Sequence, residues 1–146
     1  DDYISVLIQA ATRKAEEYIG KDIALTSNVL ILDEYSGDSL FYDESNFYSL
    51  TSIVNTDTST LITPTKQRKY RNGFYFEFSD YFSSADLTVT FRTGFNVGEC
   101  PADIKQAILL KIGDLYDSER SSYTFTSSRD TKAFEKLLDV HKILTF

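Results

Sequence analysis

The sequence predicts an α+β fold, in which helices near both ends of the chain flank a small antiparallel β-region. Near both ends, apolar residues recur at three- and four-residue spacing, as on one face of a helix. In the middle of the chain, apolar and polar residues alternate, as in a strand with one buried face. Helices and strands that are segregated along the sequence favour α+β over a parallel α/β sheet.

The first predicted element is an amphipathic helix over residues 2–20. Its apolar positions share one face and are Ile4, Leu7, Ile8, Ala11, Ala15, Tyr18 and Ile19. Asp1 and Asp2 stand at the N-terminal end, where negative charge stabilises the helix dipole. Gly20 stands just past the last turn, where a positive φ is favoured, so the helix is expected to end there.

The β-region is predicted over residues 28–97, beginning with two pairs of short strands. In the first pair, residues 29–32 form an apolar run, 36–38 (Ser-Gly-Asp) give a turn signal, and 40–42 return as the partner strand. In the second pair, residues 52–55 and 61–63 are separated by a polar, turn-like segment. Both pairs predict antiparallel neighbours.

A third hairpin is predicted at Arg71-Asn72-Gly73-Phe74, because Asn-Gly tolerates the positive φ values of a type I′ turn. An aromatic-rich strand follows at residues 74–78. Residues 87–92 then alternate Leu, Val and Phe with Thr, Thr and Arg, which indicates a strand with one buried face.

Two further helices and a linking arm are predicted after the β-region. Pro101 opens a helix over residues 101–118, which is apolar over most of its circumference and is therefore expected to be buried between other elements. The Ser- and Thr-rich residues 119–129 are expected to form a flexible arm. The last helix is predicted over residues 130–143.

Length and composition indicate a single domain with an ordinary core. The chain has 146 residues and a formal charge of −7, and one domain is usual at this length. A lone Cys100 excludes an intrachain disulfide. No apolar run approaches 18 residues, so we expect no membrane span and no signal peptide. The sequence opens at Asp1 without a methionine, and we expect a further segment to precede it.

The charge is unevenly distributed. Between residues 22 and 65 there are seven acidic residues and no Lys or Arg. A basic cluster follows at once: Lys66, Arg68, Lys69 and Arg71. A basic cluster can bind phosphate, or it can pair with the acidic segment of a neighbouring subunit. An acidic chain with four clustered bases makes few phosphate contacts, which disfavours tight nucleic-acid binding.

No catalytic, cofactor or metal signature is present in the sequence. The single histidine, His141, has no nucleophile motif beside it, and Cys100 lacks an activating neighbour. One Cys and one His cannot supply four zinc ligands. There is no GxGxxG or P-loop pattern and no EF-hand loop. The prediction is that the protein is not an enzyme and holds no cofactor or metal.

Aromatic residues are the remaining candidates for function. There are ten Tyr and eleven Phe, and rings concentrate in interfaces as well as in cores. Four phenylalanines are assigned to the core: Phe74, Phe76, Phe78 and Phe91. We expect Tyr75, Tyr81, Tyr123 and Phe125 to be exposed, with the last two offered to a partner.

Four segments resemble the head–tail connector (adaptor, head-completion) family of tailed bacteriophages. Residues 1–20 (DDYISVLIQAATRKAEEYIG) are similar to that family's first helix, and residues 100–110 (CPADIKQAILL) to its second. Residues 89–95 (VTFRTGF) are similar to a strand before the second helix, and residues 133–139 (AFEKLLD) to the closing helix. The chain departs from the family at residues 141–142, His-Lys, where the closing motif usually carries Arg.

The resemblance implies a structural virion protein at the head–tail junction, assembled in the host cytoplasm. Such proteins form a ring, typically of twelve copies, that joins the portal to a tail or stopper protein and leaves a channel through which DNA passes without specific binding. It also implies that the C-terminal part contacts the portal, which makes Phe134, Leu138 and Phe146 candidate interface residues.

Three readings stay open at this point. One is the connector. A second is another phage structural or binding module, a tail terminator or an adhesin that grips its ligand with an aromatic β-surface between residues 70 and 82. A third is a small hydrolase that uses Cys100 or His141.

Overall fold

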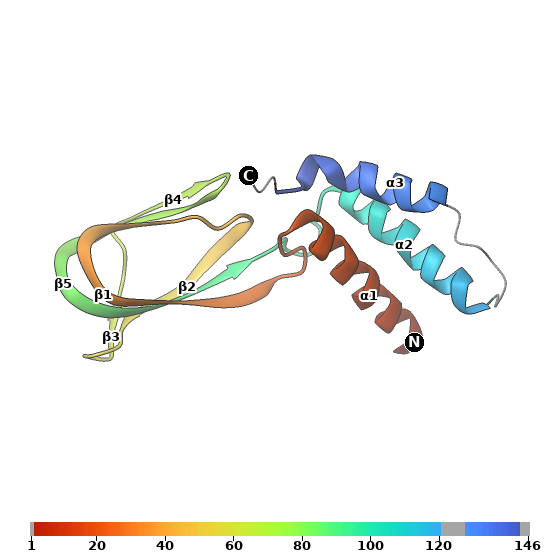
Figure 1. Ribbon diagram of the computed structural model, residues 1–146. Coiled ribbons are helices and arrows are strands. Elements are labelled where there is room, and N and C mark those ends of the chain that lie inside the picture. The colour runs from red at the N-terminus through yellow and green to blue at the C-terminus, as the bar shows by residue number, and fades with distance from the viewer. Residues whose placement is uncertain (1, 121–127, 144–146) are drawn as a thin grey trace. The chain divides into compact units, whose positions relative to one another are not determined.

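The computed structural model describes residues 2–120 and 128–143, and the chain divides into two compact units. The helix unit comprises Asp1–Ile23 and Val97–Phe146, and the strand unit comprises Ala24–Asn96. Helices and antiparallel strands are thus segregated, and the predicted α+β class is confirmed. Figure 1 shows the helices of the one unit and the strands of the other.

The helix unit contains the three predicted helices. They are α1 (Asp2–Ile19), α2 (Ala102–Arg120) and α3 (Ser128–Leu138), followed by a 3₁₀ turn, η1 (Asp139–His141). The last helix was predicted to continue to residue 143, but it tightens into η1 after Leu138. Most of the predicted arm, with Tyr123 and Phe125, lies outside the described residues, as does Phe146.

The core of the helix unit is formed by one face of each helix. Small alanines on α1 let its neighbours approach closely, and larger side chains from the other helices fill the space between. The buried residues are Leu7, Ala11, Ala15 and Ile19 of α1, Ile104 and Ala107 of α2, and Phe134 and Leu138 of α3. As predicted, α2 contacts both other helices. Its buried face is narrower than predicted, because Leu109 is 61% exposed.

Backbone hydrogen bonds join the two ends of the helix unit. Gly20 has φ +77° and donates its N–H to the Glu16 carbonyl at 2.9 Å, which confirms the predicted helix end. The N–H of Ile143 donates to the carbonyl of Ile19 at 2.9 Å. The segment after η1 is therefore held against the C-terminal end of α1.

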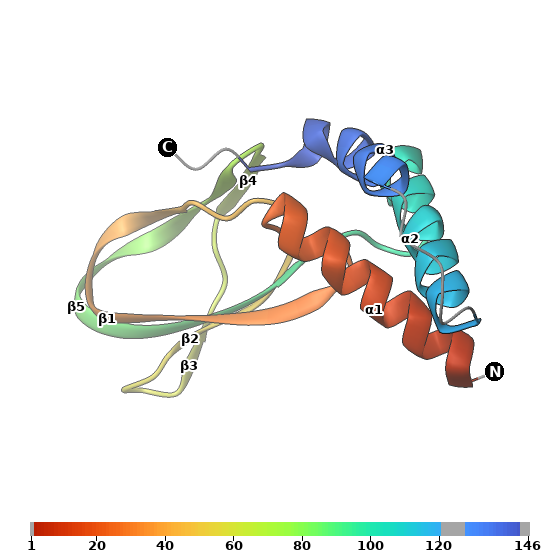
Figure 2. The same cartoon turned by 45° about the vertical axis from the view of Figure 1, so that its right-hand side comes forward.

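The strand unit is one antiparallel sheet built around its longest strand. The strands are β1 (Thr26–Tyr42), β2 (Phe47–Asn55), β3 (Thr60–Ile62), β4 (Lys66–Tyr70) and β5 (Gly73–Thr93), in the order β1-β5-β2-β3, with β4 also paired to β5. The first part of β5 lies between β1 and β4, and its last part lies between β1 and β2. Figures 1 and 2 show the β1–β5 pair bent back on itself.

Aromatic side chains fill the space inside this bend. Phe74 and Phe76 come from the first part of β5, and Val89 and Phe91 from its last part; all four are buried. The ring centroids of Phe74 and Phe91 are 5.2 Å apart, and Phe47 of β2 packs 4.6 Å from Phe74. With Phe78 also buried, the four predicted core phenylalanines are confirmed.

The turn predicted at residues 36–38 is wrong. β1 continues through this segment, and its pairing with β5 shifts register between Leu32 and Ser39. Gly37 has φ +144°, and Glu34 and, on β5, Ser84 also have positive φ. Such irregularities bend a strand pair without reversing it. Both strands bend together here, so a turn-like sequence produces a bend.

The hairpin predicted at residues 71–74 forms, but its turn differs. Tyr70 pairs with Gly73, so Arg71 and Asn72 make a two-residue turn. None of residues 71–73 has a positive φ, which excludes the expected type I′ turn. Gly73 belongs to β5 and is needed for space, because a Cβ atom there would lie 2.3 Å from the Tyr42 carbonyl oxygen.

Candidate assembly surfaces

The described residues contain no metal-binding cluster. No group of three or more His, Cys, Asp and Glu side chains comes together among them. Cys100 is half-buried just before α2, and burial raises the pKa of its thiol, which disfavours the nucleophilic thiolate. No helix in this part of the chain is long and apolar enough to cross a membrane.

His141 has a structural contact that sequence reasoning missed. Its Nε2 atom lies 2.7 Å from Oδ2 of Asp103, which stands in the first turn of α2. The hydrogen bond with His141 lowers the pKa of the Asp103 carboxyl. Because the two residues are 38 positions apart in the sequence, their spacing does not predict the contact. The contact fastens η1 to the start of α2.

Replacing Asp103 with asparagine is expected to destabilise the helix unit by about 1 kcal/mol near neutral pH, because a charged hydrogen-bond acceptor is lost. The folded pKa of Asp103 lies below its unfolded value, so its contribution is present above the ordinary carboxyl range and disappears as the pH falls through the folded pKa. Denaturant unfolding of wild type and variant, from neutral to acidic pH, measures this difference in unfolding free energy.

The control for this prediction is Glu99→Gln, which removes an exposed carboxylate just before the same helix. Its effect is expected to stay within about 0.5 kcal/mol at every pH. A difference between wild type and Asp103→Asn that does not shrink in acid would contradict a role for the Asp103 charge.

Two of the predicted interface residues are core residues. Phe134 is 5% exposed and Leu138 is fully buried, both packed inside the helix unit. The amphipathic face of α3 is thus used within the chain, and the prediction that these side chains contact a partner is not supported.

Nearby, the Tyr18 hydroxyl donates to Asp139, which raises the Tyr18 pKa to about 12.

The four basic residues singled out in the sequence form one exposed strip. Lys66, Arg68 and Lys69 lie on β4, and Arg71 lies in the following turn. All four are exposed, and the Lys66 Nζ atom lies 3.7 Å from Glu77 Oε2. The structure therefore brings the predicted cluster together at one edge of the sheet.

A second surface, the apolar outer face, was not predicted. Strand register places Ile31, Thr88, Val54 and Leu61 in one row across β1, β5, β2 and β3. Val29 lies two residues before Ile31 on the same face of β1 and begins the next row. We call the surface formed by Val29, Ile31, Val54 and Leu61 the apolar outer face. Side chains alternate between faces, and the adjacent row, Leu30-Val89-Ile53-Ile62, points into the core. Val29, Ile31 and Leu61 are 60%, 66% and 67% exposed.

The sequence held a signal for this outer face. A continuous apolar run such as Val-Leu-Ile-Leu at residues 29–32 is typical of a strand that is covered on both faces. Among the described residues, one face of that run is covered, by the aromatic core, and the other is exposed. Exposed apolar faces of this kind are typical of surfaces that contact another molecule.

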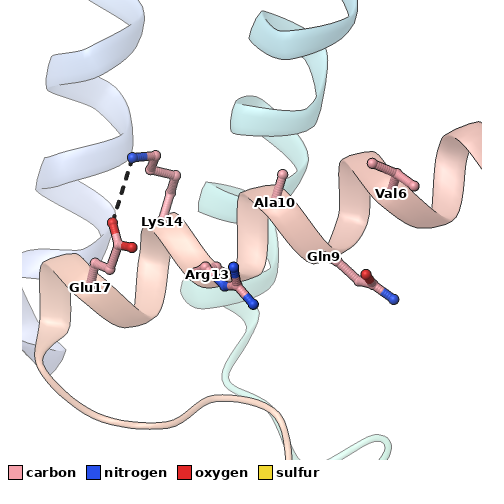
Figure 3. Close-up of a pocket in the computed structure, with 6 residues that line it drawn as sticks. All are labelled: Val6, Gln9, Ala10, Arg13, Lys14 and Glu17. Carbon is pink, nitrogen blue, oxygen red and sulfur yellow. Dashed lines mark ion pairs between the residues drawn. The ribbon is translucent and has the colours of Figure 1, made fainter.

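The outward side of α1 carries a shallow hollow rather than a substrate site. Figure 3 shows its lining residues along this one helix: Val6, Gln9, Ala10, Arg13, Lys14 and Glu17. Lys14 and Glu17 form an ion pair at 3.5 Å, with both side chains about 60% exposed. The hollow therefore offers a mixed lining, in which the apolar side chains of Val6 and Ala10 lie beside charged groups that are open to water.

Three solved structures share this fold over nearly the whole chain. A chain in the neck of a native gene transfer agent (GTA) particle, computed with C12 symmetry, matches with TM-score 0.69 and 15% identity, covering 100% of this chain and 85% of that one. A chain in the neck of the empty particle, computed with C6 symmetry, gives 0.67 and 13%, covering 98% and 78%. A chain of the native virion gives 0.68 and 16%, covering 100% and 79%.

This chain has the fold of GTA neck chains. No protein-family model matches the chain, and no curated protein matches it. The structural likeness spans both the helix unit and the strand unit. It therefore agrees with the resemblance to head–tail connectors seen in the sequence.

Proposed function

We propose that this protein is a structural component of a phage-like virion neck, where copies form a ring that joins the portal to a tail or stopper protein. The single observation that carries the proposal is the match of the whole chain to chains in neck assemblies of cyclic symmetry. A ring of twelve copies is the copy number we propose, assembled in the host cytoplasm and retained at the head–tail junction of the virion.

The charge and surface of the chain support a passive, non-enzymatic role. A net charge of −7 disfavours adhesion to DNA, as a conduit for passing DNA requires. The described residues hold no metal-binding cluster, whereas the strand unit presents an exposed apolar face. Surfaces of this kind are typical of proteins that work by assembly.

The alternative of an adhesin with an aromatic β-surface has less support. Between residues 70 and 82, Tyr75 and Tyr81 were predicted to be exposed, and Tyr81 is 71% exposed. Tyr75 is half-buried and donates its hydroxyl to Glu77 Oε1 at 2.9 Å. Phe74, Phe76 and Phe78 all point into the core. Most of the aromatic rings between residues 70 and 82 therefore lie inside the strand unit and are not available to a ligand.

Imaging of particles that contain this chain tests the proposal. The expected result is density of this fold arranged as a closed ring between portal and tail. Particles in which the chain lies only at the distal tail tip, or which assemble infectious virions without it, would overturn the proposal.

The double substitution Val29→Ser, Ile31→Ser is expected to reduce incorporation into particles roughly tenfold or more, because a buried apolar contact with a partner is lost. Both side chains are mostly exposed in the single chain, so its unfolding free energy is expected to change by less than about 1 kcal/mol. Quantitative immunoblotting of purified particles gives the first value, and denaturant unfolding gives the second.

The matched control is Val6→Ser, which removes a comparably exposed valine (59%) from α1. We expect normal incorporation for this variant. Normal incorporation of the double variant as well would show that the apolar outer face is not a contact surface.

A further inference from the structure

The two free edges of one part of the sheet carry opposite charge. Residues 74–77 of β5 pair with β4 on one side and with the last residues of β1, 39–42, on the other. Register aligns Ser39-Glu77-Lys66 and Phe41-Tyr75-Arg68 in rows across the three strands. This three-stranded segment therefore has β4 as one edge and β1 as the other.

The β4 edge is basic. Every residue of β4 is exposed, and among the described strands β4 pairs only with β5, so its outer backbone N–H and C=O groups face outward. Lys66 and Arg68 alternate with Gln67, and Lys69 and Arg71 extend the charge through Tyr70 into the turn. Within the described chain, the ion pair of Lys66 with Glu77 is the only one that this strip makes.

The β1 edge is acidic. Asp38 and Asp43 bracket residues 39–42, and both are exposed with no ion pair in the part of the chain that is described. Phe41 lies between them, 51% exposed, on the face that also carries Arg68. Along its described length β1 pairs with β5 alone, so its other backbone edge is open as well.

We propose that the basic β4 edge of one copy docks on the acidic β1 edge, residues 38–43, of the next copy. The inference rests on the proposed ring, because a contact between two different surfaces of the same chain is heterologous and closes into a ring when its rotation permits. Charge identifies the second copy as the partner. The four bases of the β4 edge meet the carboxylates of Asp38 and Asp43 on the β1 edge of the next copy. Copies that each carry −7 repel unless such local complementarity opposes it.

Strand direction fixes how the two edges meet. β1 and β4 both run antiparallel to β5, so they are parallel to one another. Head-to-tail repetition of the three-stranded segment therefore places β4 of one copy parallel to β1 of the next. Parallel strand pairs are slightly less stable per residue than antiparallel ones. Backbone pairing alone would therefore hold the two edges weakly, and the charged side chains would fix which residues pair and which edges associate.

A competing explanation makes the opposite prediction. Lysines on an edge strand commonly prevent edge-to-edge association. If β4 has only this protective role, the neutral variant Lys66→Gln, Arg68→Gln should self-associate more strongly than wild type. If β4 is the docking edge, the same variant should self-associate more weakly.

The decisive experiment is a charge exchange on the full-length chain, followed by sedimentation over a range of concentrations and salt. Wild type is expected to self-associate at low ionic strength and less so at high. Lys66→Glu with Arg68→Glu, and separately Asp38→Lys with Asp43→Lys, should each weaken self-association roughly tenfold or more. Mixing the two variants should restore association, because each then meets an oppositely charged edge.

The matched control is Arg13→Glu with Lys14→Glu on the exposed side of α1, which changes the net charge by the same amount as the β4 variant. It should associate like wild type. Wild type that stays monomeric at low salt, variants that associate normally, a mixture that does not recover, or a neutral variant that associates more strongly would each overturn the proposal.

Failure of this inference and failure of the proposed function give different results. Particles that contain a normal neck ring built from the β4 charge-reversal variant refute the edge contact and leave the neck assignment intact. Copies that associate through these edges but are absent from the neck refute the assignment and leave the contact intact.

Discussion

Replacing Gly73 with alanine is expected to destabilise the strand unit by about 3 kcal/mol, since overpacking against backbone atoms cannot relax by rotating a side chain. The added Cβ would lie 2.3 Å from the Tyr42 carbonyl oxygen, 3.2 Å from its carbonyl carbon and 3.3 Å from the Cα of Asp43. Gly73 does not have a positive φ, so the cost is steric. Denaturant unfolding and amide exchange of β1, β4 and β5 measure it.

The matched control is Gly113→Ala in α2, where nothing lies within 4 Å of the added Cβ. Alanine in the interior of a helix is favoured over glycine, so this variant should gain about 0.5–1 kcal/mol. A loss below about 1 kcal/mol for Gly73→Ala would show that β1 and β5 do not need to approach so closely.

The helices were predictable because their signals are local. Gly20 ends α1 where a positive φ was expected. Of the apolar face predicted for α1, Leu7, Ala11, Ala15 and Ile19 are buried, whereas Ile4 and Ile8 are exposed. The strand pair at β2 and β3 and the alternation in β5 were predictable for the same reason. Each depends on residues that are neighbours in the sequence.

The bend in β1 was not predictable from local signals. Ser36-Gly37-Asp38 has turn chemistry, but the chain does not reverse there, because β5 follows β1 around the bend and Ser84 donates its N–H to the Ser36 Oγ atom at 3.0 Å. Gly73 was assigned to a turn for the same reason. In both cases a partner strand distant in sequence decides what the glycine does.

The candidate surfaces divide in the same way. The basic strip could be predicted, because Lys66, Arg68, Lys69 and Arg71 are close in sequence. Of the apolar outer face, only the continuous apolar run at residues 29–32 is visible in the sequence, because the face joins four strands through register. The contact between Asp103 and His141 joins residues 38 positions apart. The burial of Phe134 and Leu138 within the helix unit could not be predicted, because the pattern of an amphipathic helix face does not say whether its own chain or a partner covers it.

Replacing Phe74 with alanine is expected to destabilise the strand unit by about 4 kcal/mol, because removing a buried phenyl ring loses its transfer free energy and leaves a cavity. Phe74 is fully buried, and its ring lies 4.6–5.6 Å from four others, those of Tyr42, Phe47, Phe76 and Phe91. Thermal or denaturant unfolding, followed through tyrosine fluorescence or circular dichroism, gives the magnitude.

The control for Phe74→Ala is Tyr81→Ala on the same strand. Tyr81 is 71% exposed, so its removal should change stability by no more than about 0.5 kcal/mol. Phe74 and Phe91 hold the two parts of β5 against each other, and with them the β4 edge and the apolar outer face. Loss of that contact should therefore abolish both proposed assembly surfaces at once, and a Phe74→Ala chain that still self-associates through β4 would show that the edge does not depend on the bend.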